Sequence, residues 1–172
     1  MRFNSDQIQK IGKEISSKVD GKTLFDEFSR GRYSTDASVY QIKPLGVVLP
    51  KDTNDVLSLM EYSQKNSVPL LARGGGSSQC GQTVGESVVI DYSKHQNKIL
   101  ELNVEEKYVW VQPGVVLDHL NAYLKPHGLW FPVDVSTSSR ATIGGMSANN
   151  SCGSRSLYYG NMVHNVLAIE AI

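Results

Sequence analysis

The segment best suited to binding a ligand is Arg73-Gly-Gly-Gly-Ser-Ser78, an arginine followed by five small residues directly after the apolar segment 69–72. Successive glycines can adopt positive φ and turn several backbone N–H groups toward one point, with no side chain in the way. Such a nest binds anions, and the two serine hydroxyls add donors. Arg73 either supplies charge or braces the loop. The run predicts a phosphate or pyrophosphate site; the alternative is a tight solvent-exposed turn.

Two familiar nucleotide-binding patterns do not describe this loop. A P-loop needs GxxxxGK followed by Ser or Thr, which the sequence lacks. A GxGxxG turn opens a helix, whereas Gly74-Gly75-Gly76 leads toward another strand-like segment at 87–91. Neither a P-loop nor a Rossmann dinucleotide site is therefore predicted.

A second region of small residues covers 142–153, with the sequence TIGGMSANNSCG. It offers hydroxyls, side-chain amides and open backbone over twelve positions, which suits a planar polar ligand. Small residues also allow a helix N-terminus to pack closely on another element. Both interpretations stay open on the sequence alone.

Metal sites and catalytic nucleophiles are not indicated. The four histidines are scattered, without HExxH or CxxC patterns: His95, His119, His127 and His164. Cys80 and Cys152 lie near the two glycine-rich regions without a local base, so we expect them to be packed side chains. The hydrolase pattern GxSxG is also absent.

Apolar spacing places the helices that must position these loops. Isoleucines at 8, 11 and 15 predict a helix over about 6–18, with Ser5 or Asp6 as N-cap. A polar turn is expected at 30–32. Residues 52–55 open a helix whose stripe contains Val56, Leu59 and Met60. Further helices are expected over 116–124 and from Thr142.

Short apolar runs predict the strands. They lie at 47–49, 69–72, 87–91 and 107–112, and the glycine loop joins the second to the third. A last strand is expected at 166–172, where the chain stops with no cap or closing turn. That ending predicts that these residues are the front part of a longer protein.

Composition limits the classes of function. A length of 172 residues suits one ordinary domain, and 17 basic against 17 acidic residues provide no field to attract nucleic acid. Two cysteines and no charged-then-apolar leader favour a cytoplasmic location. No apolar run approaches the roughly 18 residues of a membrane span, so any membrane contact is expected to be peripheral.

Motifs in a fixed order resemble a known family. They are residues 69–78 (PLLARGGGSS), Gly81-Gln82, 89–93 (VIDYS), 112–115 (QPGV), 131–136 (FPVDVS), 142–145 (TIGG), 149–153 (NNSCG) and Tyr159-Gly160. Together they resemble the N-terminal FAD-binding domain of the vanillyl-alcohol oxidase and p-cresol methylhydroxylase type. Within it, the sequence is most similar to FAD-linked D-lactate, glycolate and D-2-hydroxyglutarate dehydrogenases. The resemblance covers about residues 30–172, which leaves 1–29 as an N-terminal helical segment.

The resemblance implies an α+β fold of two small α/β subdomains with FAD between them. It assigns the first glycine loop to the FAD pyrophosphate, through Arg73, Gly74, Gly75, Gly76, Ser77, Ser78, Gly81 and Gln82. It assigns the second region to the flavin and ribityl chain, through Pro132, Asp134, Ser136, Thr142, Gly144, Gly145, Asn150, Gly153, Tyr159 and Gly160. Relatives that bind FAD covalently use a His or Cys near these loops. Here only Cys80 is nearby, which favours noncovalent FAD.

The resemblance also implies a function, the FAD-binding part of a flavin-dependent oxidoreductase that oxidises a 2-hydroxy acid. In the family, substrate residues lie mainly in a later cap domain, so no catalytic residue can be named and this chain alone is expected to be inactive. The motifs 32–37 (RYSTDA) and 46–50 (GVVLP) look most like long bacterial members, in which an iron-sulfur part follows the flavin part. The expected partners are a small 2-hydroxy acid and an electron acceptor. The alternative is a noncatalytic nucleotide- or anion-binding module with the same fold.

Overall fold

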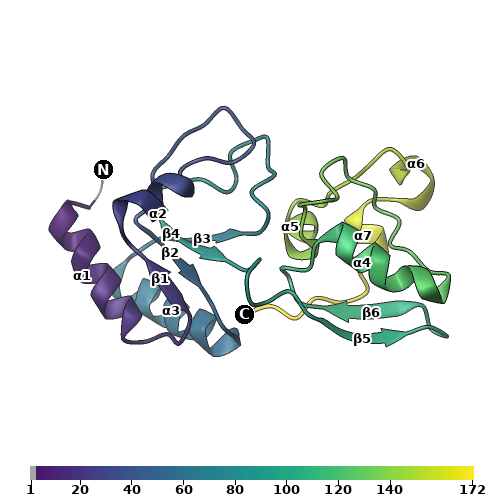
Figure 1. Cartoon of the computed structure of the whole chain (residues 1–172), viewed down its shortest axis with the longest axis horizontal. Helices are drawn as coiled ribbons and strands as arrows, with labels where there is room; N and C mark the ends of the chain where they lie inside the picture. The colour runs from purple at the N-terminus through teal and green to yellow at the C-terminus, as the bar shows by residue number, and fades with distance from the viewer. Residues whose placement is uncertain (1–2) are drawn as a thin grey trace. The chain divides into compact units, whose positions relative to one another are not determined.

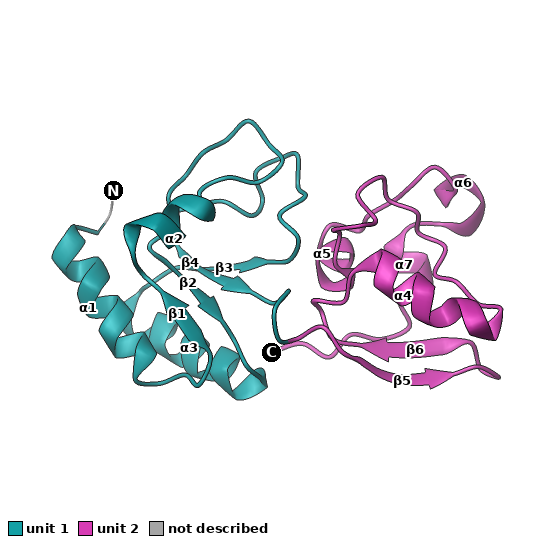
Figure 2. Cartoon of the chain, in the orientation of Figure 1, with its two compact units in different colours: residues 1–95 teal, residues 96–172 magenta. Residues whose placement is uncertain are grey.

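The computed structural model describes residues 3–172. The chain forms two compact units, residues 1–95 (unit 1) and 96–172 (unit 2), coloured separately in Figure 2. Both units combine helices with a small sheet, so the predicted α+β class is confirmed. No helix among the described residues is both long and apolar enough to span a bilayer.

Unit 1 is a four-stranded sheet with three helices (Figure 1). Its elements are α1 (Ser5–Ser16), β1 (Lys22–Leu24), α2 (Glu27–Arg32), β2 (Gly46–Leu49), α3 (Thr53–Asn66), β3 (Leu70–Arg73) and β4 (Val88–Asp91). The strand order is β1-β2-β4-β3, with β1 antiparallel to β2 and the other pairs parallel. The predicted strands at 47–49, 69–72 and 87–91 are confirmed to within one or two residues.

The central strands of this sheet are buried on both faces. One face, which includes Val48 and Val88, shares a core with α1 and α3. The opposite face, which includes Val47 and Val89, packs with Tyr33. Burial on both sides explains why β2 and β4 are continuous apolar runs rather than alternating ones. The helix at the start of the chain is therefore part of the core of unit 1.

Helix boundaries follow local capping chemistry. Asn4, rather than Ser5 or Asp6, caps α1: its Oδ1 accepts from Gln7 N at 2.9 Å, and Gln7 Oε1 accepts from Asn4 N at 2.8 Å. Asp52 caps α3 within the polar run expected to open that helix. The expected apolar stripe of α3 is only partly right, because Met60 is exposed whereas Tyr62 is buried.

The polar turn expected at 30–32 is wrong, because these residues end α2. Asp26 caps the helix by accepting from Ser29 N at 2.9 Å. The Arg30 side chain is buried; its Nε donates to the Pro44 carbonyl at 2.8 Å, and its Nη1 donates to Glu27 at 2.6 Å. Long-range anchoring of one arginine thus stabilises a helix that has too few apolar residues to show periodicity.

Unit 2 packs short helices with a two-stranded antiparallel sheet. Its elements are β5 (Ile99–Asn103), β6 (Tyr108–Val111), α4 (Leu117–Leu124), the 3₁₀ turn η1 (Lys125–His127), α5 (Ile143–Ala148), α6 (Ser156–Tyr159) and α7 (Met162–Asn165). Val115, Leu120 and Leu124 pack with β5 and β6. Leu117, Val133, Met146 and Met162 form a second cluster. The strand at 107–112 and the helices over 116–124 and from Thr142 are confirmed.

The strand predicted at 166–172 is wrong. The last helix ends at Asn165, and residues 166–172 form neither strand nor helix. Leu167 and Ile169 are exposed. An apolar run becomes a strand only when a neighbour satisfies its N–H and C=O groups, and no described strand pairs with this segment.

Candidate functional site

The glycine loop begins where β3 ends. Arg73, the last residue of β3, stands in register with Asp91, the last residue of the parallel neighbour β4. Residues 74–87 connect the two strands, so the loop leaves the sheet at the carboxyl edge of its parallel part. This edge is where ligands bind in open parallel sheets.

The loop holds a row of backbone donors that the protein does not use. Among the residues that the structure describes, none of the backbone N–H groups of Gly74, Gly75, Gly76, Ser77 and Ser78 donates a hydrogen bond. These residues are half-buried or exposed. A row of unused amides in a side-chain-poor loop is the donor set that an anion requires.

The loop conformation differs from the expected nest. Positive φ occurs at Gly76 (64°) and Gly81 (76°), not at consecutive glycines. A Cβ on Gly76 would lie 2.5 Å from Nη2 of Arg73, and a Cβ on Gly81 would lie 2.6 Å from the Tyr40 ring. Glycine is needed here both for the turn and for the close approach of neighbouring side chains.

Arg73 braces the loop, which is one of the two roles left open above. Its Nη2 donates to the Thr35 carbonyl at 2.9 Å, and its Nη1 donates to the carbonyls of Thr83 at 3.2 Å and Tyr33 at 3.5 Å. The guanidinium also lies over the Tyr33 ring, 5.2 Å from its centre. Both terminal nitrogens therefore face the protein's own chain.

A second loop, residues 33–41, lies along the glycine loop. Ala37 N donates to the Gly76 carbonyl at 3.2 Å, and Thr83 Oγ1 donates to Asp36 Oδ2 at 3.0 Å. Burial tends to raise the pKa of Asp36, but hydrogen bonds from Ser38 and Thr83 outweigh it and hold that pKa below its usual range. This bracing was missed from the sequence, because its partners lie far apart along the chain.

Below the loop, the Tyr33 hydroxyl donates to Asp91 Oδ2 at 2.6 Å. Burial, then the hydrogen bond to Asp91, raises the pKa of Tyr33 well above its usual range. Tyr33 thus stays neutral and joins the end of α2 to the end of β4.

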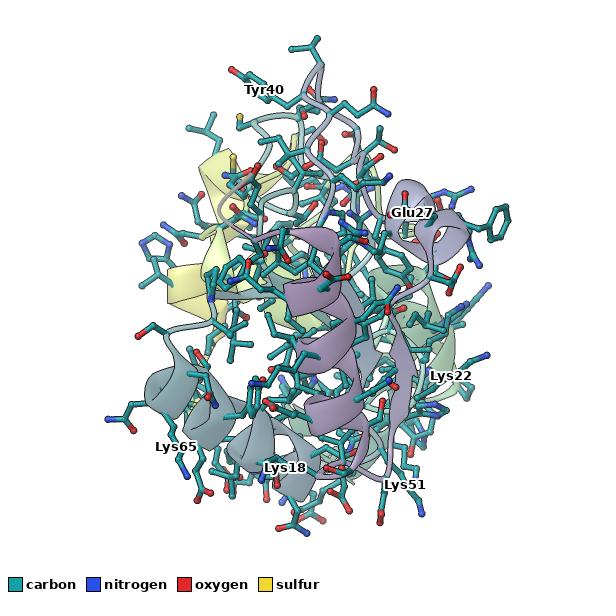
Figure 3. The ribbon with its side chains drawn as sticks, turned by 90° about the vertical axis from the view of Figure 1, so that its left-hand side faces the viewer. Lys18, Lys22, Glu27, Tyr40, Lys51 and Lys65 are labelled. Atoms are coloured by element: carbon teal, nitrogen blue, oxygen red, sulfur yellow. The ribbon has the colours of Figure 1, made fainter. Side chains whose placement is uncertain are left out.

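Four surface lysines of unit 1 lie away from this loop. Figure 3 shows Lys18, Lys22, Lys51 and Lys65 at the opposite end of unit 1 from Tyr40, which contacts Gly81. The glycine loop therefore depends on backbone donors rather than on those four charges.

The polar side chains of the loop are partly engaged. The Ser78 hydroxyl donates to the Gln82 side-chain carbonyl and accepts from Cys80 N at 3.2 Å. The expected packing of the cysteines is wrong, because Cys80 and Cys152 are both free and exposed. No group of three or more His, Cys, Asp or Glu side chains within residues 3–172 could hold a metal ion.

In unit 2, the first turn of α5 packs against residues 113–115, the turn that precedes α4. Ile143 N donates to the Val115 carbonyl at 2.8 Å, and Gly144 N donates to the Pro113 carbonyl at 2.9 Å. Thr142 caps the helix by accepting from Gly145 N at 3.3 Å. The packing interpretation describes this turn, since its backbone donors are used internally rather than left open.

Asp134 braces the segment after α5. Its carboxylate accepts from Ser154 Oγ at 2.7 Å and from Arg155 N at 3.0 Å. The Arg155 amide, then the Ser154 hydroxyl, holds the pKa of Asp134 below its usual range. A Cβ on Gly153 would lie 2.3 Å from the Asp134 main-chain oxygen, so this contact requires glycine.

The other expected residues of unit 2 are less constrained by polar contacts. Asn150 has a φ of 45° and accepts from Val163 N at 3.0 Å, and Gly160 has a φ of 82°. The half-exposed Tyr159 ring meets Trp130 edge-on, 5.2 Å between centres. Pro132 is half-buried and Ser136 is exposed. Residues 73–82 belong to unit 1 and residues 132–160 to unit 2. Within the unit 2 set, Asp134 lies against Gly153 and Thr142 accepts from Gly145 N.

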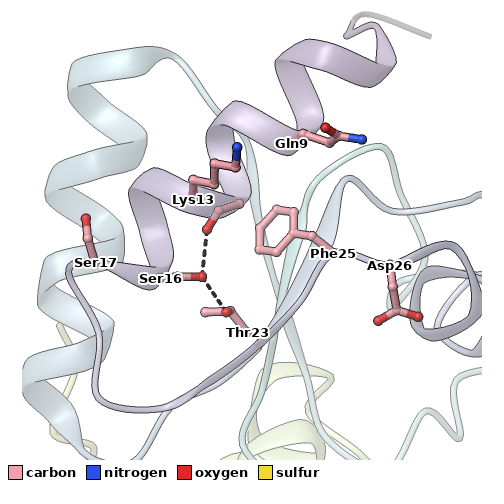
Figure 4. A pocket seen from close by; sticks show the side chains of 8 residues that line it. Gln9, Lys13, Ser16, Ser17, Thr23, Phe25 and Asp26 are labelled. Carbon is pink, nitrogen blue, oxygen red and sulfur yellow. Dashed lines mark hydrogen bonds between the residues drawn. The ribbon is translucent and has the colours of Figure 1, made fainter.

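A groove beside α1 contains none of these residues (Figure 4). Its lining includes Gly12, Ser16, Thr23 and Phe25. The Ser16 hydroxyl donates to the Gly12 carbonyl at 2.7 Å and lies 2.6 Å from the Thr23 hydroxyl. The polar groups of Gly12, Ser16 and Thr23 in this groove therefore already bond to one another.

Comparison with known proteins gives a consistent result. The family described as FAD binding domain matches residues 44–172. D-2-hydroxyglutarate dehydrogenase from Haemophilus influenzae is 43% identical over 142 residues, covering 81% of this chain and 14% of the relative. The enzyme of the same name from Escherichia coli is 40% identical over 155 residues, covering 88% and 15%. A glycolate oxidase subunit from Bacillus subtilis is 36% identical over 170 residues, covering 96% and 36%.

Solved structures share the fold. An alkyldihydroxyacetonephosphate synthase superposes with a TM-score of 0.77 at 22% identity, covering 90% of this chain and 31% of that one. The 4-ethylphenol oxidase from Gulosibacter chungangensis gives 0.72 at 23% identity, covering 87% and 30%. The chain spans only 14% to 16% of the length of the D-2-hydroxyglutarate dehydrogenases that it matches.

Proposed function

The chain belongs to the FAD-binding domain family, and on that premise we propose that it serves as the flavin-binding part of an oxidoreductase acting on a 2-hydroxy acid. The observation that carries this proposal is the row of unused amides at residues 74–78, at the carboxyl end of β3. No observation favours the alternative of a noncatalytic binding module.

The amides of residues 74–78 are proposed to hold the FAD pyrophosphate. They fit it because they are unpaired donors in a loop of glycines and serines, whose small side chains leave the amides accessible. Gly81 and Gln82 support the loop from behind, Gln82 through Ser78. Neutral amides bind a diphosphate without adding a side chain whose ordering would cost entropy.

Ten residues of unit 2 are proposed to line the flavin and ribityl chain. They are Pro132, Asp134, Ser136, Thr142, Gly144, Gly145, Asn150, Gly153, Tyr159 and Gly160. In this proposal Thr142 and Asp134 act indirectly, since each accepts hydrogen bonds from its own backbone neighbourhood. The half-exposed Tyr159 ring offers an apolar face.

The substrate class is inferred from the relatives reported above, because D-2-hydroxyglutarate and glycolate both carry a hydroxyl next to a carboxylate. Bound FAD supplies the two-electron acceptor for such an oxidation. The residues of this chain bind and orient the cofactor, and none of them is proposed to act on the substrate. The electron acceptor and any iron-sulfur cluster are proposed to belong to the longer protein.

A titration of the 172-residue chain with FAD tests the cofactor proposal. Flavin fluorescence should be quenched with saturation at one equivalent, and ADP should compete because it carries the same pyrophosphate. Riboflavin, which lacks it, should bind far more weakly. A folded chain that binds FAD no better than riboflavin would contradict the pyrophosphate assignment.

A dye-reduction assay tests the activity proposal. A protein extended to the length of the D-2-hydroxyglutarate dehydrogenases should reduce a dye with D-2-hydroxyglutarate, D-lactate or glycolate. The 172-residue chain with FAD should not, because orientation of substrate against cofactor is worth roughly 7–11 kcal/mol of barrier. Equal rates for the two proteins would show that this chain carries its own substrate site.

A further inference from the structure

We propose that Arg73 is a positioning residue, which strengthens pyrophosphate binding by shaping the loop and not by contributing its charge. This inference rests on the proposed function, in which the amides of residues 74–78 bind that group. A lone arginine beside an anion loop would ordinarily be assigned a direct ion pair. The geometry points elsewhere, because both terminal nitrogens of Arg73 donate to main-chain carbonyls.

The three carbonyls come from both sides of the loop. Thr35 and Tyr33 belong to the loop 33–41, and Thr83 belongs to the far end of the glycine loop. A guanidinium can reach them together because its donors diverge in one rigid plane. The Tyr33 ring, 5.2 Å away, fixes that plane from one side. A lysine has one nitrogen and cannot occupy the same three positions.

Neighbouring hydrogen bonds extend the bracing by Arg73 to residues 74–78, whose amides are the proposed donors. Gly76, in the middle of that row, accepts from Ala37 N at 3.2 Å. Thr83 donates to Asp36 at 3.0 Å. Arg73 therefore adds a third contact between the two loops, and we expect its loss to free residues 74–78 to leave the conformation that binds the pyrophosphate.

Arg73→Lys and Arg73→Met separate shape from charge, with substitutions of the exposed Arg32 of α2, Arg32→Lys and Arg32→Met, as matched controls. Lys keeps the positive charge but lacks the diverging N–H donors of the guanidinium, whereas Met lacks both. Both Arg73 variants should weaken FAD binding by at least tenfold and to a similar extent. The dependence of the dissociation constant on salt should match that of the unmodified chain, since no ion pair is lost. The Arg32 variants should bind FAD unchanged.

Hydrogen exchange of the chain without FAD gives an independent readout. In both Arg73 variants, exchange should quicken at the hydrogen-bonded amides of Ala37, Cys80 and Val84 and stay unchanged in unit 2. Gly76→Ala should reproduce the pattern with the arginine charge intact, because its Cβ would displace Nη2.

Three results would overturn the proposal. One is an Arg73→Lys variant that binds FAD normally while Arg73→Met loses affinity and salt dependence, which would identify a direct ion pair. Another is unchanged hydrogen exchange in every variant. The third is an unmodified, folded chain that does not bind FAD, which would remove the proposed function as well; the first two leave that function standing.

Discussion

Gly153 and Asp134 form one of the closest backbone contacts near the candidate site. A Cβ on Gly153 would lie 2.3 Å from the Asp134 main-chain oxygen and the same distance from its Oδ1. Asp134 in turn holds Ser154 and Arg155. At the scale of single residues, position 153 therefore requires glycine because neighbouring atoms leave no space for a Cβ, not because the chain must be flexible there.

We expect Gly153→Ala to lower the free energy of unfolding by about 1–3 kcal/mol, as overpacking does. Asp134 must move, which loosens the segment after α5. Chemical denaturation of the two proteins measures the difference. Gly145→Ala is the control in the same unit, because its Cβ meets only Thr142 Oγ1 at 3.2 Å. Equal destabilisation by both substitutions would contradict the assigned contact.

Asp36 gives the glycine loop a defined pH dependence. Its pKa is lowered in the folded chain, so its contribution to stability is present above its unfolded value of about 3.9 and is lost as pH falls through the lower folded value. Asp36→Asn removes this contribution. The difference in Tm between the two proteins should be constant from pH 5 to 8 and should shrink below about pH 4. A difference that persists to pH 2 would show that the carboxylate charge is unimportant.

Among the elements, α3 is tied to its surroundings by a buried carboxylate. Asp55, in the first turn of α3, accepts from Asp20 N at 2.7 Å, Gly21 N at 2.9 Å and Lys51 N at 2.7 Å. These amides belong to the turn before β1 and the turn after β2. One side chain thus joins three elements of unit 1.

Asp55→Ala should destabilise the chain by about 3 kcal/mol or more, because three backbone donors lose a charged acceptor. Asp55→Asn should cost less, since one carbonyl oxygen remains. Urea denaturation gives both values, and Glu61→Ala on the exposed face of α3 is the control. An Asp55→Ala variant as stable as the Glu61→Ala variant would exclude a structural role for the Asp55 carboxylate.

For the whole molecule, the testable property is whether FAD is attached covalently or held without a covalent bond. Cys80 is exposed two residues after Ser78, so it is the nearest group in the loop that could form a covalent bond. We predict that FAD is held without one. Acid precipitation of the FAD-loaded chain should release all the yellow colour to the supernatant, and Cys80→Ser should leave the bound flavin unchanged. Colour that stays in the pellet, and is lost in Cys80→Ser, would reverse this prediction.

Much of the fold follows from the sequence because its determinants are local. Asp52 and the stripe with Val56 and Leu59 define α3 within a few turns, and the apolar runs of β2 and β4 identify buried strands. The glycine loop stood out by composition, since few structural needs put three glycines and two serines together. Such features depend on neighbours within one turn or on the two faces of one strand.

Tertiary structure alone decided what the charged residues do. Arg73 bonds to carbonyls 10, 38 and 40 positions away, and Tyr33 bonds to Asp91 58 positions away. Another such contact, from Arg30 to the Pro44 carbonyl 14 positions away, stabilises α2, which lacks an apolar period. Residues 166–172 have the pattern of a strand, but no described strand pairs with them. Spacing along a chain determines which face a residue occupies. Only the folded backbone determines which carbonyl or amide lies opposite it, because those partners come from segments that the local pattern does not connect.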